Sequence, residues 1–475
     1  MRFSDYFGTT CSQAELDFVD ITLGRDIKVF LDPYALANTR TDWCEDAHAI
    51  AWGFFDLVLR RLKDGKREEA KRLLGHLHED NRTRLGYSDD KPQGTGFGES
   101  LTVPFMNAWQ DSDAFKSGYI GDLETAALFV DGIGLDIVSD MTTNMIHEPL
   151  AKYTQEQCRL LGIPMEKSEN LVVWRNGVGW IPERFDLPTD GVFPVLLVPR
   201  SIIRKDLSLE PDPYLTDFLD EYYEKSDPHA TSSLEKLIQQ VPMKHKGKSV
   251  HRRDLREKLW KKGSKKSVMA KVMEGAPKTL DGYKARARLK RPVLTPHQIE
   301  NIHPEHRAID LTVLRSLIRR VWEVTDDVGK LLRVIARALT ASFHPILQHP
   351  RLLGVEIDGV AGVVFSNAAS DGLLWQWRHD GNKDDPNLVV LTTASSITDE
   401  LLARFDFQAM RQSTKSGAVV LVGTEIDKAV RERRDRLRKS RVMLLRISDL
   451  ARIIEVDAGP DVAMETLKSI VAQND

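Results

Sequence analysis

One set of residues with the types and spacing that metal chemistry needs lies at residues 131–144. Asp136 and Asp140 are four residues apart, and so are Asp140 and Asn144. On a helix this spacing places the three side chains on one face, where their oxygen atoms would suit Mg²⁺. A simpler role is also open, because Ser139 or Asp140 is a natural N-cap for a helix that begins there. Asp136, Asp140 and Asn144 are therefore candidate metal ligands.

A second acidic set lies near a predicted hairpin in the last third of the chain. Glu356, Asp358 and Asp371 are the carboxylates that a metal-dependent hydrolase would use to hold a cation and activate water. The alternative is structural: Asp358-Gly359 and Asp371-Gly372 fit turns, with Glu356 in solvent. A two-acid site also needs a partner on the central strand, and residues 388–396 contain no acid. These three residues are the candidate catalytic set.

A strongly basic segment lies between the two acidic sets. Residues 244–292 contain 12 lysines and 6 arginines against 4 acidic residues, a net charge of +14 in a chain whose formal net charge is −3. Such residues contact phosphates in a salt-sensitive, sequence-independent way, and Trp260 offers a ring for base stacking. A solvated charged linker is the alternative. The candidate nucleic-acid-binding residues are Arg252, Arg253, Arg256, Lys258, Lys261, Lys262, Lys265 and Lys266.

The composition is that of an ordinary globular protein. A chain of 475 residues, 41% hydrophobic and 29% charged, is long enough for two or three domains with their own cores. No segment approaches the ~20 apolar residues of a membrane helix, and the N-terminus lacks the apolar core of a signal peptide. Cys11, Cys44 and Cys158 are too few and too scattered for a disulfide framework or a zinc site. We therefore expect a cytoplasmic protein with no membrane partner.

The elements that must position these residues fall into three regions. Residues 1–205 are expected to form a mixed α/β domain, and residues 206–304 a basic helical bridge. Within the first region, the apolar spacing predicts two helices broken near Asp64-Gly65 and a long helix from about Asp140. It also predicts strands at residues 26–32, 127–130 and 191–203.

Residues 305–475 show the order α-β-β-β-α-β-α-β-α. Helical periodicity covers residues 310–347, 397–414 and 427–440, and a final short helix begins near Asp449. Apolar runs predict strands at residues 352–357, 362–367, 387–393, 417–424 and 441–447. This order favours an α/β sandwich around a central mixed sheet.

Five short motifs follow one another along this last region. They are Phe343 with Pro345 and Leu347, Glu356 with Ile357 and Gly359, Asn367 with Ala369 and Gly372, Gln408 with Arg411, and Asp449 with Leu450. In order and spacing they resemble the restriction-endonuclease-like domains of the PD-(D/E)XK group. The similarity is to C-terminal domains of prokaryotic proteins, many of them associated with anti-phage defence. Residues 30–33, 85–88 and 132–144 also look like the leading domain of such proteins.

The resemblance implies metal-dependent phosphodiester cleavage, but the residues for it are replaced. The family's aspartate corresponds to Gly362, and its acid and lysine to Leu391 and Thr393, or to Thr392 and Ala394 if the register shifts by one. None of these side chains binds a metal strongly, so the resemblance implies a scaffold that has lost its active site. Hydroxyl groups suited to phosphate oxygens remain at Thr392, Thr393, Ser395 and Ser396.

The sequence thus predicts a nucleic-acid-binding protein of a bacterial defence-type system, with DNA or another nucleic acid as the expected ligand and an inactive nuclease domain. An enzymatic activity of its own is not expected if this domain is inactive, and a protein partner is then expected to supply the catalysis. One alternative is an active Mg²⁺-dependent deoxyribonuclease that uses relocated acids or the Asp136 and Asp140 set. The other is a protein-interaction scaffold whose basic surface meets an acidic partner. Mg²⁺ is expected as a cofactor only under the nuclease alternative.

Overall fold

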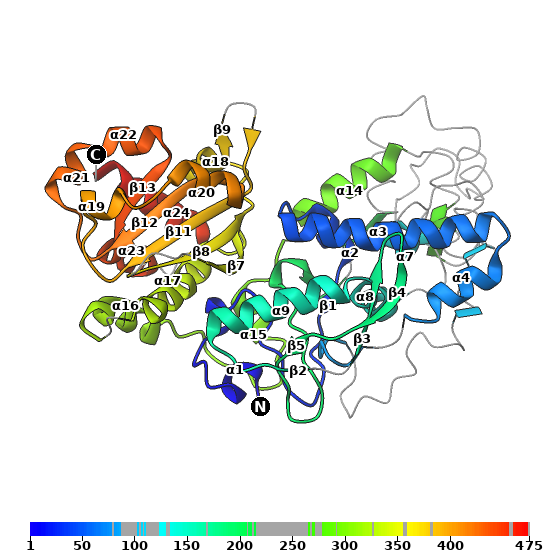
Figure 1. Ribbon diagram of the computed structural model, residues 1–475. Helices are drawn as coiled ribbons and strands as arrows, with labels where there is room; N and C mark the ends of the chain where they lie inside the picture. The colour runs from blue at the N-terminus through cyan, green and yellow to red at the C-terminus, as the bar shows by residue number, and fades with distance from the viewer. Residues whose placement is uncertain are drawn as a thin grey trace, which may run out of the picture.

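Two bodies lie side by side in the computed structural model (Figure 1). The described residues within 1–214 and 265–303 build the N-terminal body, and those within 311–473 build the C-terminal body. The structure describes residues 1–77, 80–86, 102–103, 106–107, 109–110, 123–129, 134–167, 170–206, 208–210, 213–214, 265–266, 268–270, 278–290, 292–324, 327–354, 359–380, 383–455 and 459–473.

A five-stranded mixed sheet forms the centre of the C-terminal body. Its strand order is β13-β12-β11-β8-β7. The antiparallel part contains β7, β8 and β11, and the parallel part contains β11, β12 and β13. The mixed sheet that the sequence predicts is therefore confirmed. The bounds are β7 (Leu347–Leu353), β8 (Val360–Asn367), β11 (Asn387–Thr393), β12 (Ser416–Gly423) and β13 (Val442–Arg446).

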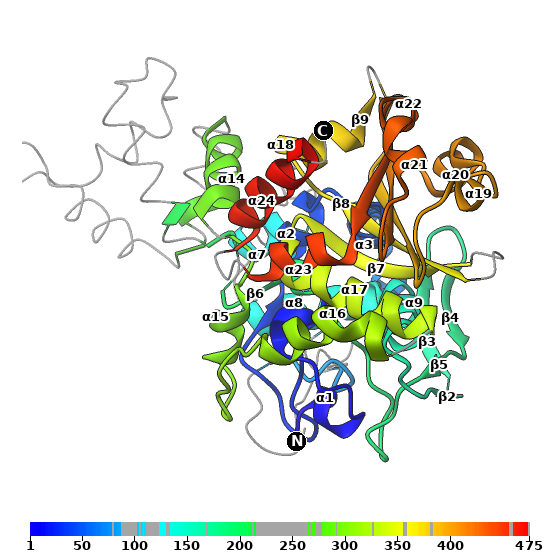
Figure 2. The same ribbon diagram turned by 90° about the vertical axis from the view of Figure 1, so that its left-hand side faces the viewer.

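Each face of this sheet buries its own apolar core, because side chains alternate between the faces along a strand. Val363 and Phe365 contribute to one core, and Val364 and Leu391 to the other. Figure 2 shows helices on both sides of the sheet. The first core is covered by α16 (Thr312–Val324), α17 (Val328–Phe343), α23 (Ile447–Glu455) and α24 (Pro460–Gln473). The second is covered by α19 (Asp399–Leu402), α20 (Phe407–Thr414), α21 (Lys428–Glu432) and α22 (Arg434–Lys439).

Most C-terminal strands match the sequence prediction, and β11 has the predicted bounds. The strand predicted at residues 352–357 is instead β7, which begins at Leu347. This edge strand tolerates Pro350 through a register irregularity between Gln348 and Arg351. The helix predicted at residues 310–347 is divided, because the Asp327 side chain caps a new helix, α17. The β8–β11 connection contains three elements that were not predicted: α18 (Gly372–Arg378), β9 (His379–Asp380) and β10 (Lys383–Asp384).

The N-terminal body is mainly helical around one large core. Its helices are α1 (Phe3–Tyr6), α2 (Pro33–Asn38), α3 (Asp42–Lys63), α4 (Arg67–Leu74), α7 (Leu123–Phe129), α8 (Leu135–Met145) and α9 (His147–Leu161), with the short turns η1 (Gln13–Glu15) and η2 (Arg200–Ile202). Its antiparallel pairs are β1 (Phe30–Leu31) with β6 (Ile203–Arg204), β2 (Glu166–Lys167) with β5 (Asp186–Leu187), and β3 (Leu171–Arg175) with β4 (Gly179–Glu183).

Several N-terminal predictions are wrong, while the helix break near Asp64-Gly65 is confirmed. Residues 127–129 of the strand predicted at 127–130 belong to helix α7, since a four-residue apolar run fits either structure, and residue 130 lies outside the described residues. The strand predicted at residues 26–32 is limited to the two residues of β1. The segment 191–203 is buried through Val195–Val198 but joins a ladder only at its end, in β6.

The described parts of the predicted bridge pack on the N-terminal body. Helix α14 (Lys278–Lys290) and helix α15 (Pro296–Glu300) bury Tyr283, Ala287 and Ile299 in its core. This half of the bridge is therefore part of a packed domain and not a solvated linker. In the described ranges, no helix has both the length and the apolar character needed to cross a membrane.

Candidate functional site

The positions at which the nuclease resemblance places its acids lie opposite each other in the sheet. In the β8–β11 ladder, Leu391 pairs with Gly362 and Thr393 pairs with Val360. Leu391 and Val360 belong to the core beneath α19–α22, and Leu391 is fully buried. Two positions chosen from separate motifs thus meet across neighbouring strands, and neither carries a metal-binding group.

Protein atoms also fill the end of the sheet beside these positions. A Cβ atom added at Gly423 would lie 2.7 Å from Cγ1 of Ile397, 2.9 Å from the carbonyl oxygen of Ser395 and 3.2 Å from Cγ2 of Thr393. The segment after β11 therefore lies directly on the end of β12. The Oγ atoms of Thr393 and Ser395 are 2.9 Å apart and hydrogen-bond to each other.

The four hydroxyl residues near this edge divide between core and surface. Thr392 is fully buried and Thr393 is 1% exposed, because the central strand is covered on both faces. The expectation that these two threonines contact phosphate is therefore wrong. Ser395 is exposed and Ser396 is half-buried, so these two serines remain accessible.

Other residues that carry the resemblance have structural roles here. The Nδ2 of Asn367 donates to the carbonyl oxygen of Leu374 (2.9 Å), and its Oδ1 accepts from the backbone N–H of Ala369 (3.1 Å). Asp449 is buried and accepts hydrogen bonds from the backbone N–H and the guanidinium of Arg446 (2.9 and 3.1 Å). These contacts close turns at the ends of β8 and β13.

The structure does not bring Asp371 to the positions where an active site is expected. Asp371 is exposed at the N-terminus of α18, after the last residue of β8, Asn367. Gly362 lies five residues before Asn367, so this end of β8 is separated from Gly362 by roughly 16 Å at about 3.3 Å per residue. The other two candidate catalytic residues, Glu356 and Asp358, lie outside the described residues.

The candidate metal ligands Asp136, Asp140 and Asn144 all lie on helix α8, as their spacing predicts. The helix begins earlier than expected, with Gly134 at its N-cap, so neither Ser139 nor Asp140 caps it. The Nδ2 of Asn144 donates to the backbone carbonyl of Asp140 (2.8 Å), and the Oγ of Ser139 accepts from the backbone of β1 (3.0 Å). Residues 135–139 also adopt helical conformation, so the predicted start near Asp140 lies too late in the chain.

The carboxylates of Asp136 and Asp26 both lie close to Gly86. A Cβ atom on Gly86 would lie 3.2 Å from Oδ1 of Asp136 and 3.5 Å from Oδ2 of Asp26. Gly86 has φ +140°, a conformation that favours glycine. Burial raises the pKa of Asp136. Across the described ranges, no group of three or more His, Cys, Asp or Glu side chains is placed to hold a metal.

This carboxylate pair lies in the part of the chain that a known family covers. Residues 8–210 match the family described as Domain of unknown function (DUF8370). The match includes Asp26, Asp136, Asp140 and Asn144, and it ends before α14. Neither a curated protein nor a solved structure matches the chain.

Most of the predicted nucleic-acid-binding residues lie outside the described part of the chain. These are Arg252, Arg253, Arg256, Lys258, Lys261 and Lys262. Lys265 and Lys266 are described, lie in helical conformation and each interact with another group. They precede the buried residues Val268 and Met269, so this end of the segment is anchored in the N-terminal core.

A basic surface that sequence reasoning missed lies on α21 and α22. Residues 427–441 contain 8 basic and 3 acidic residues. Arg431 and Arg433 are 52% and 67% exposed, and each forms an ion pair at the surface. The run of charged residues can be read from the sequence. Only the structure shows that the buried Val430 packs this helical segment against the sheet. The exposed basic residues of this surface are Lys428, Arg431, Arg433, Arg436 and Lys439.

A buried histidine–carboxylate pair was also missed. The Nε2 of His147 lies 2.5 Å from Oδ2 of Asp80, and its Nδ1 lies 2.9 Å from the carbonyl oxygen of Val172. Both partner atoms are oxygens, a carboxylate on one side and a backbone carbonyl on the other, so the ring is held from both sides. Burial alone would raise the pKa of Asp80, but the charges of Arg82 and His147 hold that pKa well below its usual range. The pair ties the start of α9 to the loop after α4.

A third polar cluster is buried where the two bodies meet. The Oη of Tyr153 donates to Oδ2 of Asp17 (2.7 Å), and Nε2 of His344 lies 3.9 Å from Oδ1 of Asp17. Burial lowers the pKa of Arg200 to about 10. Among the described residues, Nε and Nη1 of Arg200 and both ring nitrogens of His349 have no hydrogen-bond partner. Buried groups of this kind are usually satisfied by ordered water.

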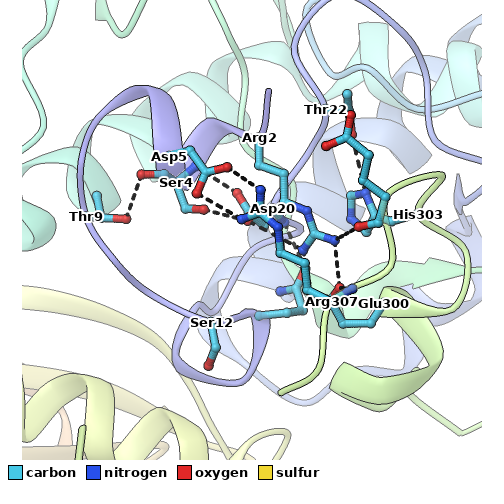
Figure 3. Close-up of polar contacts among 12 residues, drawn as sticks. Arg2, Ser4, Asp5, Thr9, Ser12, Asp20, Thr22, Glu300, His303 and Arg307 are labelled. Atoms are coloured by element: carbon cyan, nitrogen blue, oxygen red, sulfur yellow. Dashed lines mark hydrogen bonds and ion pairs between the residues drawn. The ribbon is translucent and has the colours of Figure 1, made fainter. Parts of the chain in front are cut away.

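An ion-pair network joins the start of the chain to residues 300–307 (Figure 3). The guanidinium of Arg2 donates to both carboxylate oxygens of Glu300 (2.6 and 2.7 Å), and both residues are 2% exposed. Asp20 lies 4.0 Å from Arg2 and accepts from the backbone and hydroxyl of Ser4. Near the surface, Arg307 pairs with Asp5. The separation of 298 residues between Arg2 and Glu300 left no sign of this pair in the sequence.

Proposed function

We propose that the chain is a nucleic-acid-binding protein whose C-terminal body is a restriction-endonuclease-like scaffold without catalytic residues. In this proposal the protein belongs to a bacterial defence-type system in the cytoplasm and binds DNA. A separate protein partner supplies the cleavage. The C-terminal body contributes a rigid sheet and a basic outer surface.

The observation that carries this proposal is the pairing of Gly362 with Leu391. The spacing of two independent motifs selected these positions, and antiparallel neighbours on adjacent strands are where two acids would share a metal. A glycine and a fully buried leucine cannot ligate a cation. The close packing around Gly423 further supports a core that has been rebuilt without a metal.

The charge distribution supports nucleic-acid binding over a purely structural role. Exposed guanidinium groups on α21 and α22 suit phosphate oxygens, which they contact with two parallel hydrogen bonds. The basic segment at residues 244–292 adds a second group of positive charges. Together they provide contacts that depend on salt and not on base sequence.

A second candidate function rests on the convergence of Asp26 and Asp136 at Gly86. Two carboxylates beside a glycine turn are the start of a Mg²⁺ site in a nuclease that has moved its chemistry to the N-terminal body. Loss of metal-dependent cleavage in Asp26→Asn and Asp136→Asn variants, with folding retained, would favour this alternative.

A salt titration of DNA binding tests the main proposal. Fluorescence anisotropy with a labelled duplex should show an affinity that falls steeply with salt. Replacing Arg431, Arg433 and Arg436 together by Gln should reduce the slope of log K against log salt by about 2 to 3, since each phosphate contact contributes about 0.9. An unchanged slope would argue against this surface. The matched control replaces three exposed basic residues of the N-terminal body by Gln: Arg40, Arg184 and Lys205.

A further inference from the structure

An open groove lies on the N-terminal body between α3, α4 and the turn of the β3–β4 hairpin. Its volume is about 560 Å³, within the ~300–1,000 Å³ of typical small-molecule sites. Figure 1 shows these elements together, at the end of the body away from the C-terminal sheet. None of the candidate sites described above lies in this groove.

The groove is held open by specific contacts between the hairpin and the helix. A Cβ atom on Gly53, in the middle of α3, would lie 2.6 Å from Nδ2 of Asn176. That Nδ2 donates to the carbonyl oxygen of Ala49 (3.1 Å), and Nε1 of Trp174 donates to Oδ1 of Asn176 (2.8 Å). A glycine inside a helix is unfavourable relative to alanine. Here it lets the hairpin dock closely, so the groove is preformed.

The groove exposes large apolar side chains that its own walls do not cover. Trp52 is 49% exposed and Val178, at the hairpin turn, is 69% exposed, whereas Trp174 behind them is 3% exposed. An indole ring presented beside a preformed cavity offers a stacking surface for a flat ring. Exposed apolar surface rimmed by polar residues marks ligand-binding grooves.

Two guanidinium groups lie along the same wall. Arg60 follows Trp52 by two helical turns and pairs with Asp56, and Nε of Arg61 lies 2.8 Å from Oε2 of Glu69. The Arg60 side chain is 65% exposed. Each guanidinium has five N–H donors, so an ion pair with one carboxylate leaves donors for a second anion. Their carboxylate partners orient them at the groove.

We propose that this groove binds a nucleotide unit. The base stacks on the indole of Trp52, and the phosphate accepts hydrogen bonds from Arg60 and Arg61. A flat aromatic ring joined to an anion is the ligand chemistry that matches a tryptophan and two arginines within about 560 Å³. Such a unit comes from a free nucleotide or from a single strand, and the experiment below separates the two sources.

The inference goes beyond the proposed function, because the groove lies in the N-terminal body and takes an unpaired base. Duplex binding through α21 and α22 leaves all bases stacked in the double helix. If the α21–α22 variant binds duplex DNA normally, the proposal for the groove is unaffected. If Trp52→Ala leaves oligonucleotide binding unchanged, the proposal of duplex binding by α21 and α22 is unaffected.

The test is equilibrium binding by the full-length protein. A fluorescein-labelled single-stranded oligothymidine is titrated by anisotropy, and adenosine monophosphate and inorganic phosphate serve as competitors. Trp52→Ala should weaken oligonucleotide binding about ten-fold or more, because stacking of a base contributes on this scale. Arg60→Gln should weaken it and also flatten the salt dependence. Phosphate alone should compete far less than the nucleotide.

Matched controls exist in the C-terminal body. Trp375 is 38% exposed, and Arg404 forms the same i,i+4 ion pair with Glu400 that Arg60 forms with Asp56. Trp375→Ala and Arg404→Gln should leave binding unchanged. Competition by the mononucleotide supports a free-nucleotide source, and binding of the oligonucleotide alone, lost in Trp52→Ala, supports a single strand. Binding that Trp52→Ala leaves unaltered, or no binding of either probe, would overturn the proposal.

Discussion

At the scale of single residues, buried histidines couple this fold to pH. His349 is 2% exposed and packs against the rings of Trp43 and Tyr153, with centroid distances of 5.1 and 5.6 Å. Burial lowers its pKa to about 4, and burial also lowers the pKa of His303 to about 4. Both rings are therefore neutral in the folded protein at pH values where the unfolded chain, with a pKa near 6.5, is protonated.

The protein should accordingly lose stability as the pH falls from about 6.5 towards 4. Over this window the unfolded chain binds protons that the folded chain does not, so the free energy of unfolding falls with decreasing pH. His349→Gln should make this dependence shallower by up to about 1.4 kcal/mol per pH unit. Urea unfolding at a series of pH values measures the slope. The same change at the exposed His297 is the matched control, and an equal change of slope in both variants would contradict this account.

At the scale of elements, the sheet of the C-terminal body depends on close approaches that only glycine permits. A Cβ atom on Gly417, in β12, would lie 2.0 Å from the carbonyl oxygen of Trp377 and 2.8 Å from Cα of Arg378. The obstacle is backbone at the end of α18, which cannot rotate away as a side chain would. This contact holds the β8–β11 connection against the parallel part of the sheet.

Gly417→Ala should therefore destabilise the C-terminal body by about 1–3 kcal/mol or more, as overpacking of a core does. Gly354 is the matched control, because nothing lies within 4 Å of a Cβ atom placed there. Gly354→Ala should be nearly neutral. Thermal unfolding followed by circular dichroism compares the two, and equal midpoints would show that the packing around β12 is looser than described.

The sequence predicts elements well where local patterning decides them. The apolar run Leu388–Leu391 is bounded by Asn387 and Thr392, and β11 has the predicted limits. It predicts poorly where packing decides: residues 127–130 fit a strand and a helix equally well, and α7 is a helix. Motif spacing selected Gly362 and Leu391, and the structure shows that these two positions lie opposite each other. The groove at Trp52 was not predicted from the sequence. The role of Gly53 becomes clear only in the structure, where Asn176 lies against it.

At the scale of the whole molecule, buried ion pairs join distant parts of the chain. Arg2 meets Glu300 within the N-terminal body, while Arg337 of α17 donates to Glu15 (2.6 Å) and connects the two bodies. A buried pair stabilises little relative to an apolar pair, but loss of one partner leaves a charge without compensation. These pairs therefore fix where the late segments dock.

Arg2→Met should lower the free energy of unfolding of the N-terminal body by about 3–5 kcal/mol, because the carboxylate of Glu300 remains buried. The double variant Arg2→Met with Glu300→Leu should recover part of the loss. Arg307→Gln breaks the neighbouring pair with Asp5, whose partners are 44% and 40% exposed, and should cost only about 0–1 kcal/mol. Urea unfolding of the three variants measures these free energies. Similar decreases in the free energy of unfolding for Arg2→Met and Arg307→Gln would refute the role assigned to burial.

The most direct measurement of the central claim is a cleavage and binding assay on the purified full-length protein. Supercoiled plasmid, linear duplex and single-stranded DNA are each incubated with Mg²⁺, with Mn²⁺ or with EDTA and resolved on a gel. The account predicts DNA that is shifted but intact under all three conditions, with a shift that fades as salt rises. Cleavage of DNA only when metal is present would contradict this account. Such a result would make Asp26 and Asp136 the candidate metal-binding residues of an active nuclease.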